Sequence, residues 1–82
     1  MILQIECFAG ARDANDGCDF VRVEVDAGAT AGEVLRAIAQ QHPPLADLAS
    51  RSRLAADDAY VDANAVMKAD QKLALIPPVS GG

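Results

Sequence analysis

The sequence has few of the residues on which small proteins build covalent or metal-based structure. Its 82 residues include two cysteines, one histidine and no tryptophan. Cys7 and Cys18 are too few and too far apart for a disulfide framework or a zinc site. Cys7 falls in an apolar pattern, so we expect it to be buried, whereas Cys18 follows Gly17 in an expected loop.

Basic and aromatic residues are also scarce. Seven Lys and Arg residues stand against twelve Asp and Glu residues, which gives a formal net charge of −5. An acidic surface disfavours binding to nucleic acid and to anionic membranes, so we expect neither as a partner. Two Phe residues and one Tyr leave most of the core to Val, Leu and Ile.

Long apolar runs are absent as well. No stretch approaches the roughly 18 apolar residues that suggest a membrane-spanning helix. The first six residues contain no basic segment of the kind that opens a signal peptide. We therefore expect a cytoplasmic protein. A chain of 82 residues forms one domain, too small for both a core and a large catalytic cavity, so a self-contained enzyme is not expected.

The residue types that carry catalysis are not grouped in this sequence. No nucleophile–base pair, metal cluster or phosphate-binding glycine loop is visible. The glycines of segment 28–32 lack a Walker lysine and the dinucleotide spacing, so we interpret this segment as a helix start. His42 precedes Pro43 after an expected helix and is interpreted as a surface residue. We expect no bound cofactor and no metal.

The first third of the chain shows the alternation that is typical of strands. Residues 2–8 and 19–25 each have a period of two, with one apolar face and one polar face. Residues 9–17 between them are rich in Gly, Asp and Asn, which favour turns. We therefore expect an N-terminal hairpin with a loop at 9–17.

A helical pattern follows. Thr30 and Glu33 fit a capping box, and the predicted helix runs to about Gln41, with Arg36 and Gln40 also on its outer face. The predicted inward stripe consists of Ala31, Val34, Leu35, Ile38 and Ala39. The helix ends there because a residue that precedes proline avoids helical geometry.

The pattern in the second half of the chain predicts shorter elements. They are a helical turn at 45–50, short strands at 54–56, 60–61 and 65–67, a turn at 57–58 and a final buried strand at 73–76. If the helix is a crossover, the first and last strands lie side by side and parallel. The predicted fold class is α+β, a β-grasp (ubiquitin-like) arrangement with a mixed sheet and one main helix packed across it.

The residues that follow the last predicted strand cannot continue it. Pro77 and Pro78 lack N–H groups and lead the chain out of the sheet. We therefore expect a single domain over 1–76 and an extended, flexible tail over 77–82, which spans roughly 20 Å. Two terminal glycines would let another protein surround the carboxylate of Gly82, which is the remaining candidate for a reactive group.

Activation of that carboxylate needs a second protein. A carboxylate is a poor acyl donor until it becomes a mixed anhydride, such as an acyl-adenylate made from ATP. The sequence has no ATP-binding motif, so a partner enzyme would have to use the ATP.

Three segments carry a resemblance to a known family. The most specific is Pro-Pro-Val-Ser-Gly-Gly at 77–82, and the others are Phe8-Ala9 followed by Arg12, and the helix start at 30–35. Together they resemble the ubiquitin-like sulfur carriers of the MoaD/ThiS family, in particular the small subunits of molybdopterin synthase. The likeness spans essentially the whole chain.

The resemblance implies a sulfur-transfer cycle. An E1-like adenylyltransferase would adenylate Gly82, a sulfur donor protein would convert it to a thiocarboxylate, and the tail would enter the large subunit of molybdopterin synthase. There the sulfur would build the dithiolene that later holds molybdenum. The chain would be the sulfur-donor subunit of this transferase, in a heterotetramer, and would catalyse nothing alone.

The resemblance also implies which residues meet the large subunit. They are Phe8, Arg12, Ile76, Pro77, Pro78, Val79 and Ser80, with Gly81 and Gly82 as the reacting end. Two alternatives to these partner contacts stay equally open. Phe8 could be a core side chain, and Arg12 could be a solvated surface charge. The family often has Asn where this sequence has Asp57, so partner contacts near that turn stay open.

Other functions also stay open. A sulfur carrier for thiamine thiazole or another thiolation uses the same thiocarboxylate, although the two prolines before the tail favour molybdopterin. A ubiquitin-like protein modifier begins with the same adenylate and ends in isopeptide bonds. A β-grasp interaction module with an idle tail is the remaining class.

Overall fold

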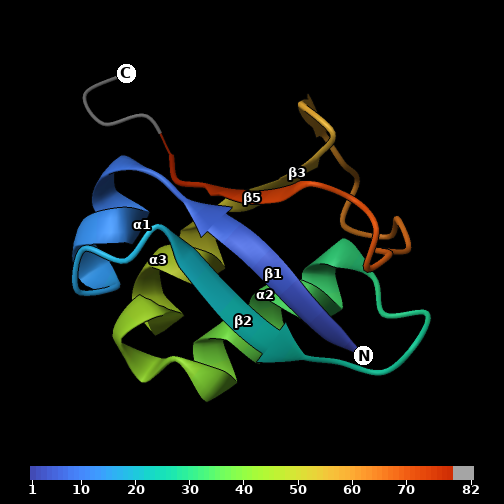
Figure 1. Ribbon diagram of the computed structural model, residues 1–82, viewed down its shortest axis with the longest axis horizontal. Helices are drawn as coiled ribbons and strands as arrows, with labels where there is room; N and C mark the ends of the chain where they lie inside the picture. The colour runs from blue at the N-terminus through green and yellow to red at the C-terminus, as the bar shows by residue number, and fades with distance from the viewer. Residues whose placement is uncertain (79–82) are drawn as a thin grey trace.

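The computed structural model describes residues 1–78 and contains a five-stranded sheet in the order β2-β1-β5-β3-β4. The strands are β1 (Ile2–Cys7), β2 (Phe20–Glu24), β3 (Arg53–Ala56), β4 (Ala59–Tyr60) and β5 (Leu73–Ile76). The helical elements are α1 (Ala9–Ala14), α2 (Ala31–Gln41), the 3-10 turn η1 (Pro43–Leu45) and α3 (Ala46–Arg51). Figure 1 shows α2 crossing behind β1 and β2, so one face of the sheet is covered and the other is open.

The last strand lies in the middle of the sheet. β5 pairs in parallel with β1, from Ile5↔Leu73 to Cys7↔Leu75, and antiparallel with β3 on its other side. β1 pairs antiparallel with β2. The predicted hairpin, the parallel pairing of the first and last strands and the β-grasp fold class are therefore confirmed.

The core lies between the sheet and α2. Each long strand buries alternate residues, as its period of two predicts. The strands contribute Leu3, Ile5, Cys7, Val21, Val23, Leu54, Ala56, Leu73 and Leu75, which are all buried. Full burial of one Val, Leu or Ile side chain stabilises a fold by about 1.5–3 kcal/mol, so this layer supplies most of the driving force.

Helix α2 begins with the predicted capping box. Glu33 N–H donates to Thr30 Oγ1 at 3.3 Å, and Thr30 N–H donates to Glu33 Oε1 at 3.0 Å. These bonds from the Thr30 backbone and hydroxyl hold the pKa of Glu33 below its ordinary value. The inward stripe differs slightly from the prediction, because Ala37 is buried while Leu35 and Ala39 are only half-buried.

The predicted loop at 9–17 is wrong over residues 9–14, where α1 forms. Ala11 of this helix is fully buried, which offsets the cost of a helix only six residues long. The turn-forming residues act only at its end, where Asn15 N–H donates to Ala11 O at 3.0 Å. Asp16 and Gly17 then take positive φ values of 58° and 77°, which reverse the chain toward β2.

The second half follows the sequence pattern closely. The helical turn is α3, and the strands at 54–56 and 60–61 are β3 and β4 to within a residue. Asp57 and Asp58 form the predicted turn with φ values of 51° and 70°, the left-handed geometry of a two-residue hairpin loop. The predicted strand at 65–67 is reduced to one bridge, Thr30↔Val66. Within residues 1–78, no helix has the length and apolar character needed to cross a lipid bilayer.

The capping box predicts a measurable stability effect. Thr30→Ala removes the hydroxyl that accepts from Glu33 N–H, and we expect a loss of about 1 kcal/mol in the free energy of unfolding. For a domain of this size, that loss lowers Tm by about 4–8 °C. Thr30→Ser keeps the hydroxyl and should stay near the wild-type Tm in the same circular-dichroism melt. Equal melting of the Ala and Ser variants would show that the cap contributes nothing.

Candidate functional site

The chain leaves the sheet at its central strand. β5 ends at Ile76, and Pro77 and Pro78 follow, the first half-buried and the second exposed. Because β5 runs parallel to β1, this exit lies beside the end of β1 and the start of α1 (Figure 1). Four predicted site residues lie outside the described residues: the predicted partner contacts Val79 and Ser80, and the predicted reacting end, Gly81 and Gly82. The division into a domain at 1–76 and a tail at 77–82 stays a prediction.

A hollow of about 330 Å³ opens on the uncovered face of the sheet, directly beside the exit. We call it the exit hollow. It is lined by Glu6, Phe8, Ala55, Asp58, Tyr60, Lys72, Ala74 and Ile76. Its residues come from β1, β3, β4 and β5 and from the segments that flank them.

Small side chains on the outer face create this hollow. Ala74 alternates with buried Leu73 and Leu75 along β5, so it faces outward. It pairs directly with Ala55 of β3. Two methyl groups side by side leave a depression in the sheet surface, and larger side chains surround it.

Phe8 and Tyr60 are the aromatic walls of the exit hollow. Phe8 is 45% exposed and Tyr60 is 58% exposed, so each offers apolar surface to a partner. The interpretation of Phe8 as a core residue is therefore wrong, while its contact with a partner stays a prediction. The guanidinium of Arg53 lies 4.4 Å from the centroid of the Tyr60 ring, a cation–π contact that holds the ring in place.

The rim of the exit hollow is charged. Glu6, Asp58 and Lys72 line it, so a partner has to complement both signs of charge. Asp57, next to Asp58, joins two parts of this rim, because its N–H donates to Lys72 O at 2.9 Å and its Oδ1 accepts from Lys72 N–H at 3.0 Å.

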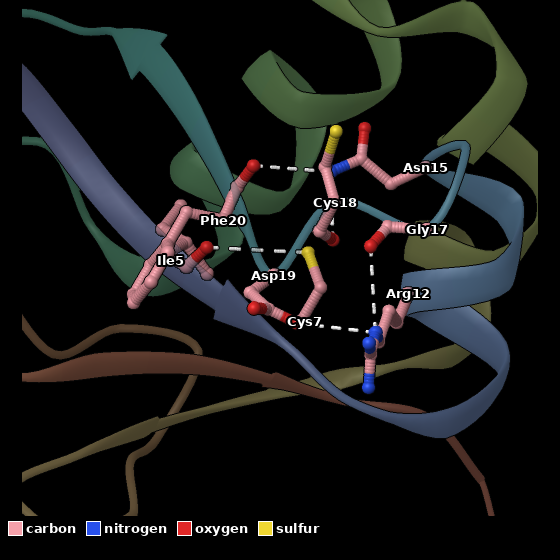
Figure 2. Close-up of polar contacts among 8 residues, drawn as sticks. All are labelled: Ile5, Cys7, Arg12, Asn15, Gly17, Cys18, Asp19 and Phe20. Carbon is pink, nitrogen blue, oxygen red and sulfur yellow. Dashed lines mark hydrogen bonds and ion pairs between the residues drawn. The ribbon is translucent and has the colours of Figure 1, made fainter.

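Arg12 is held on a different part of the surface. Its Nε lies 3.1 Å from Asp19 Oδ1 and donates to Gly17 O at 3.4 Å, as Figure 2 shows. Both side chains of the ion pair are more than half exposed, so the pair contributes at most about 1 kcal/mol. Arg12 does not line the exit hollow.

The structure therefore brings together only part of the predicted set. Phe8 and Ile76 meet in the exit hollow, Pro77 and Pro78 lie at the exit, and Arg12 is elsewhere. Sequence reasoning did not assign Tyr60, Lys72 or the other lining residues to the site. One signal was available: the single tyrosine lies two residues after the paired aspartates of a predicted turn, and so close to the loop that joins two predicted strands.

The geometry of the exit hollow suits the recognition of a partner. Among residues 1–78, no group of three or more His, Cys, Asp and Glu side chains could hold a metal ion. The exit hollow is a shallow, open surface of apolar walls and charged rim, beside the exit of a chain end. Such a surface can dock a partner and present the chain end to it.

Comparison with known proteins agrees with this geometry. The sequence model of the ThiS family matches residues 5–82. The structure of SAMP1, a small archaeal modifier protein from Haloferax volcanii, aligns with a TM-score of 0.79 at 29% identity, covering 100% of both chains.

Two further solved structures show the same fold. Subunit 1 of a putative molybdopterin converting factor from Pyrococcus furiosus aligns with a TM-score of 0.76 at 21% identity, covering 96% of this chain and 99% of that one. A complex of subunits 1 and 2 of the molybdopterin-converting factor from Helicobacter pylori contains a chain that aligns with a TM-score of 0.65. Its identity is 23%, and the alignment covers 100% of each chain.

The two cysteines lie outside the exit hollow and differ in access. Cys7 is 2% exposed, and its Sγ lies 3.9 Å from Ile5 O (Figure 2). Burial, followed by the charge of Asp19, raises the pKa of the Cys7 thiol. Cys18 is exposed, and both cysteines are free thiols. The predicted burial of Cys7 is confirmed.

This difference predicts selective thiol chemistry. In the folded protein, an aromatic disulfide reagent should react quickly with Cys18, and at least about 100-fold more slowly with Cys7, which needs local opening of the core. The Cys18→Ser variant should contain no thiol that reacts quickly while the protein is folded. Unfolding that variant in urea should make the Cys7 thiol react. Two equally fast thiols in the folded wild type would contradict the burial of Cys7.

Proposed function

The chain belongs to the ThiS family, and on that basis we propose that it is a sulfur carrier whose terminal Gly82 takes up sulfur as a thiocarboxylate. The observation that carries this proposal is the family match over residues 5–82, which runs through Gly81 and Gly82. The family and the likeness to SAMP1 support a sulfur carrier or a protein modifier. The more specific proposal is a role in molybdenum cofactor biosynthesis.

The proposed chemistry uses only the main-chain carboxylate of this chain. In the activating step, a carboxylate oxygen of Gly82 attacks the α-phosphorus of ATP on an E1-like adenylyltransferase, and pyrophosphate leaves. Sulfide delivered by a sulfur donor protein then attacks the carbonyl carbon, AMP leaves with the former carboxylate oxygen, and the thioacid loses its proton to give the thiocarboxylate. The net change is the replacement of one carboxylate oxygen by sulfur.

The contribution of this chain is to position the reacting end. β5 is hydrogen-bonded on both sides, to β1 and to β3, so the point at which the tail begins is fixed. The exit hollow lies beside that point and includes Ile76 itself. A partner that docks on the hollow therefore receives the tail from a defined origin, which reduces the entropy that the reaction must lose.

We propose the large subunit of molybdopterin synthase as the acceptor of the sulfur. The related Helicobacter pylori chain occurs in a complex of subunits 1 and 2 of the molybdopterin-converting factor. The proposed complex is a heterotetramer in which the large subunit covers the exit hollow and encloses the tail. Phe8, Ile76, Pro77 and Pro78 would then be its contact residues, and Arg12 an outlying one.

A protein modifier is the second candidate. It is favoured by the likeness to SAMP1, which at 29% identity covers both chains completely. A modifier would share the adenylate and differ only in the nucleophile, a lysine amine in place of sulfur. A sulfur carrier for thiamine thiazole remains the alternative within carrier chemistry.

Intact mass spectrometry of the protein from its native host distinguishes these functions. We expect a species in which one oxygen is replaced by sulfur, and its loss on deletion of Gly82 without a change in Tm. A set of larger conjugates joined through Gly82 would favour the modifier. An unmodified chain that retains full activity without Gly82 would leave neither proposal standing.

The exit hollow predicts a docking difference between two exposed aromatics. Phe8→Ala should weaken binding to the large subunit at least about tenfold, because aromatic anchors at an interface centre contribute more than about 1.4 kcal/mol. Phe20→Ala is the matched control: Phe20 is 49% exposed but does not line the hollow. Calorimetric titration of both variants measures the effect. Equal losses, or no loss for Phe8→Ala, would place the docking surface elsewhere.

A further inference from the structure

The longer free edge of the sheet belongs to β2. Its inner side pairs with β1, and beyond the last paired residue Cys7 N–H donates to Asp19 O at 2.6 Å. Alternate residues of an antiparallel strand turn their N–H and C=O groups to the other side. The residues whose backbone groups face outward are therefore Phe20, Arg22 and Glu24.

Side chains at the end of α2 make hydrogen bonds with these outward-facing backbone groups. Gln41 Oε1 accepts from Glu24 N–H at 2.9 Å, and Gln41 Nε2 donates to Glu24 O at 2.8 Å. One carboxamide thus makes the pair of hydrogen bonds that a residue of a neighbouring strand would make. The next residue, His42, lies 2.7 Å from Arg22 O through Nε2. Because a carbonyl oxygen only accepts, Nε2 is the donor in this bond.

A third side chain covers the start of the same edge. Asn15 Nδ2 donates to Phe20 O at 3.1 Å (Figure 2). Within residues 1–78, only the outward N–H groups of Phe20 and Arg22 are left without a partner. Most of the groups that could pair with another strand are therefore already bonded.

Unprotected strand edges invite pairing with another strand. We propose that Gln41 and His42 close the outer edge of β2 against strand addition, and that removing them makes this edge a pairing surface for a second copy of the chain. The other edge, β4, has only two residues and offers little to pair with.

The sequence of β2 favours a second copy of the chain as the partner that pairs with this edge. If two β2 strands pair antiparallel about Val23, Arg22 of one copy lies opposite Glu24 of the other, and the reverse also holds. Both residues have outward-facing backbone groups. In this register the backbone groups of the two copies can therefore hydrogen-bond, and the opposite charges of the side chains lie opposite each other. The contact is self-complementary, which produces a closed dimer.

Hydrogen exchange of the full-length wild-type protein tests the closure directly. The Glu24 amide should exchange at least about tenfold more slowly than the Arg22 amide, because only Glu24 N–H has an acceptor. Gln41→Ala should raise the Glu24 rate to that of Arg22 and leave the Val23 amide protected. Gln40→Ala, on the same helix turn, is the control and should change neither. Equal wild-type rates for Glu24 and Arg22 would overturn the proposal.

Sedimentation equilibrium tests the second part of the proposal, that the unprotected edge of β2 pairs with a second copy of the chain. The Gln41→Ala/His42→Ala variant should show a species of twice the wild-type mass, whose fraction rises with protein concentration. Adding Arg22→Pro removes an outward N–H and should abolish that species, since proline is tolerated on an edge strand but cannot pair there. Wild-type mass at every concentration, or doubling that survives Arg22→Pro, would refute pairing at this edge.

Discussion

The parallel pairing of β1 with β5 is the constraint on which the rest of the structure depends. Two parallel strands cannot be joined by a tight turn, so the chain between them has to cross the sheet, and α2 is the element that does so. Because α2 covers one face, the opposite face stays open. The pairing also places the last strand at the centre, where its end is held from both sides.

The exit hollow follows from that arrangement and from residue size. A central strand that ends in solvent brings its outward residues close to the point where the tail begins. Alanine at the paired positions 55 and 74 keeps this surface low, while Phe8 and Tyr60 stand around it. The candidate site is thus made by the residues that surround the end of β5.

Local patterns in the sequence predicted the elements whose cause is local. The capping box of Thr30 and Glu33 and the alternation of β1 depend on neighbours in the chain, and both are confirmed. Helix α1 escaped prediction because its support is the burial of Ala11, a tertiary effect. The same holds for the site: Tyr60 joins Phe8 only through the sheet order, and the sequence placed Gln41 and His42 at the surface without indicating their bonds to β2.

The direction of β1 has a practical consequence for work on this chain. Met1 donates from its ammonium group to Val25 O at 2.9 Å, at the end of β1 that is far from the exit (Figure 1). Six strand residues separate the two ends by roughly 20 Å. An affinity handle or a fluorophore joined ahead of Met1 therefore lies well away from the exit hollow, the proposed docking surface, whereas an extension beyond Gly82 would block the carboxylate on which the proposed function depends.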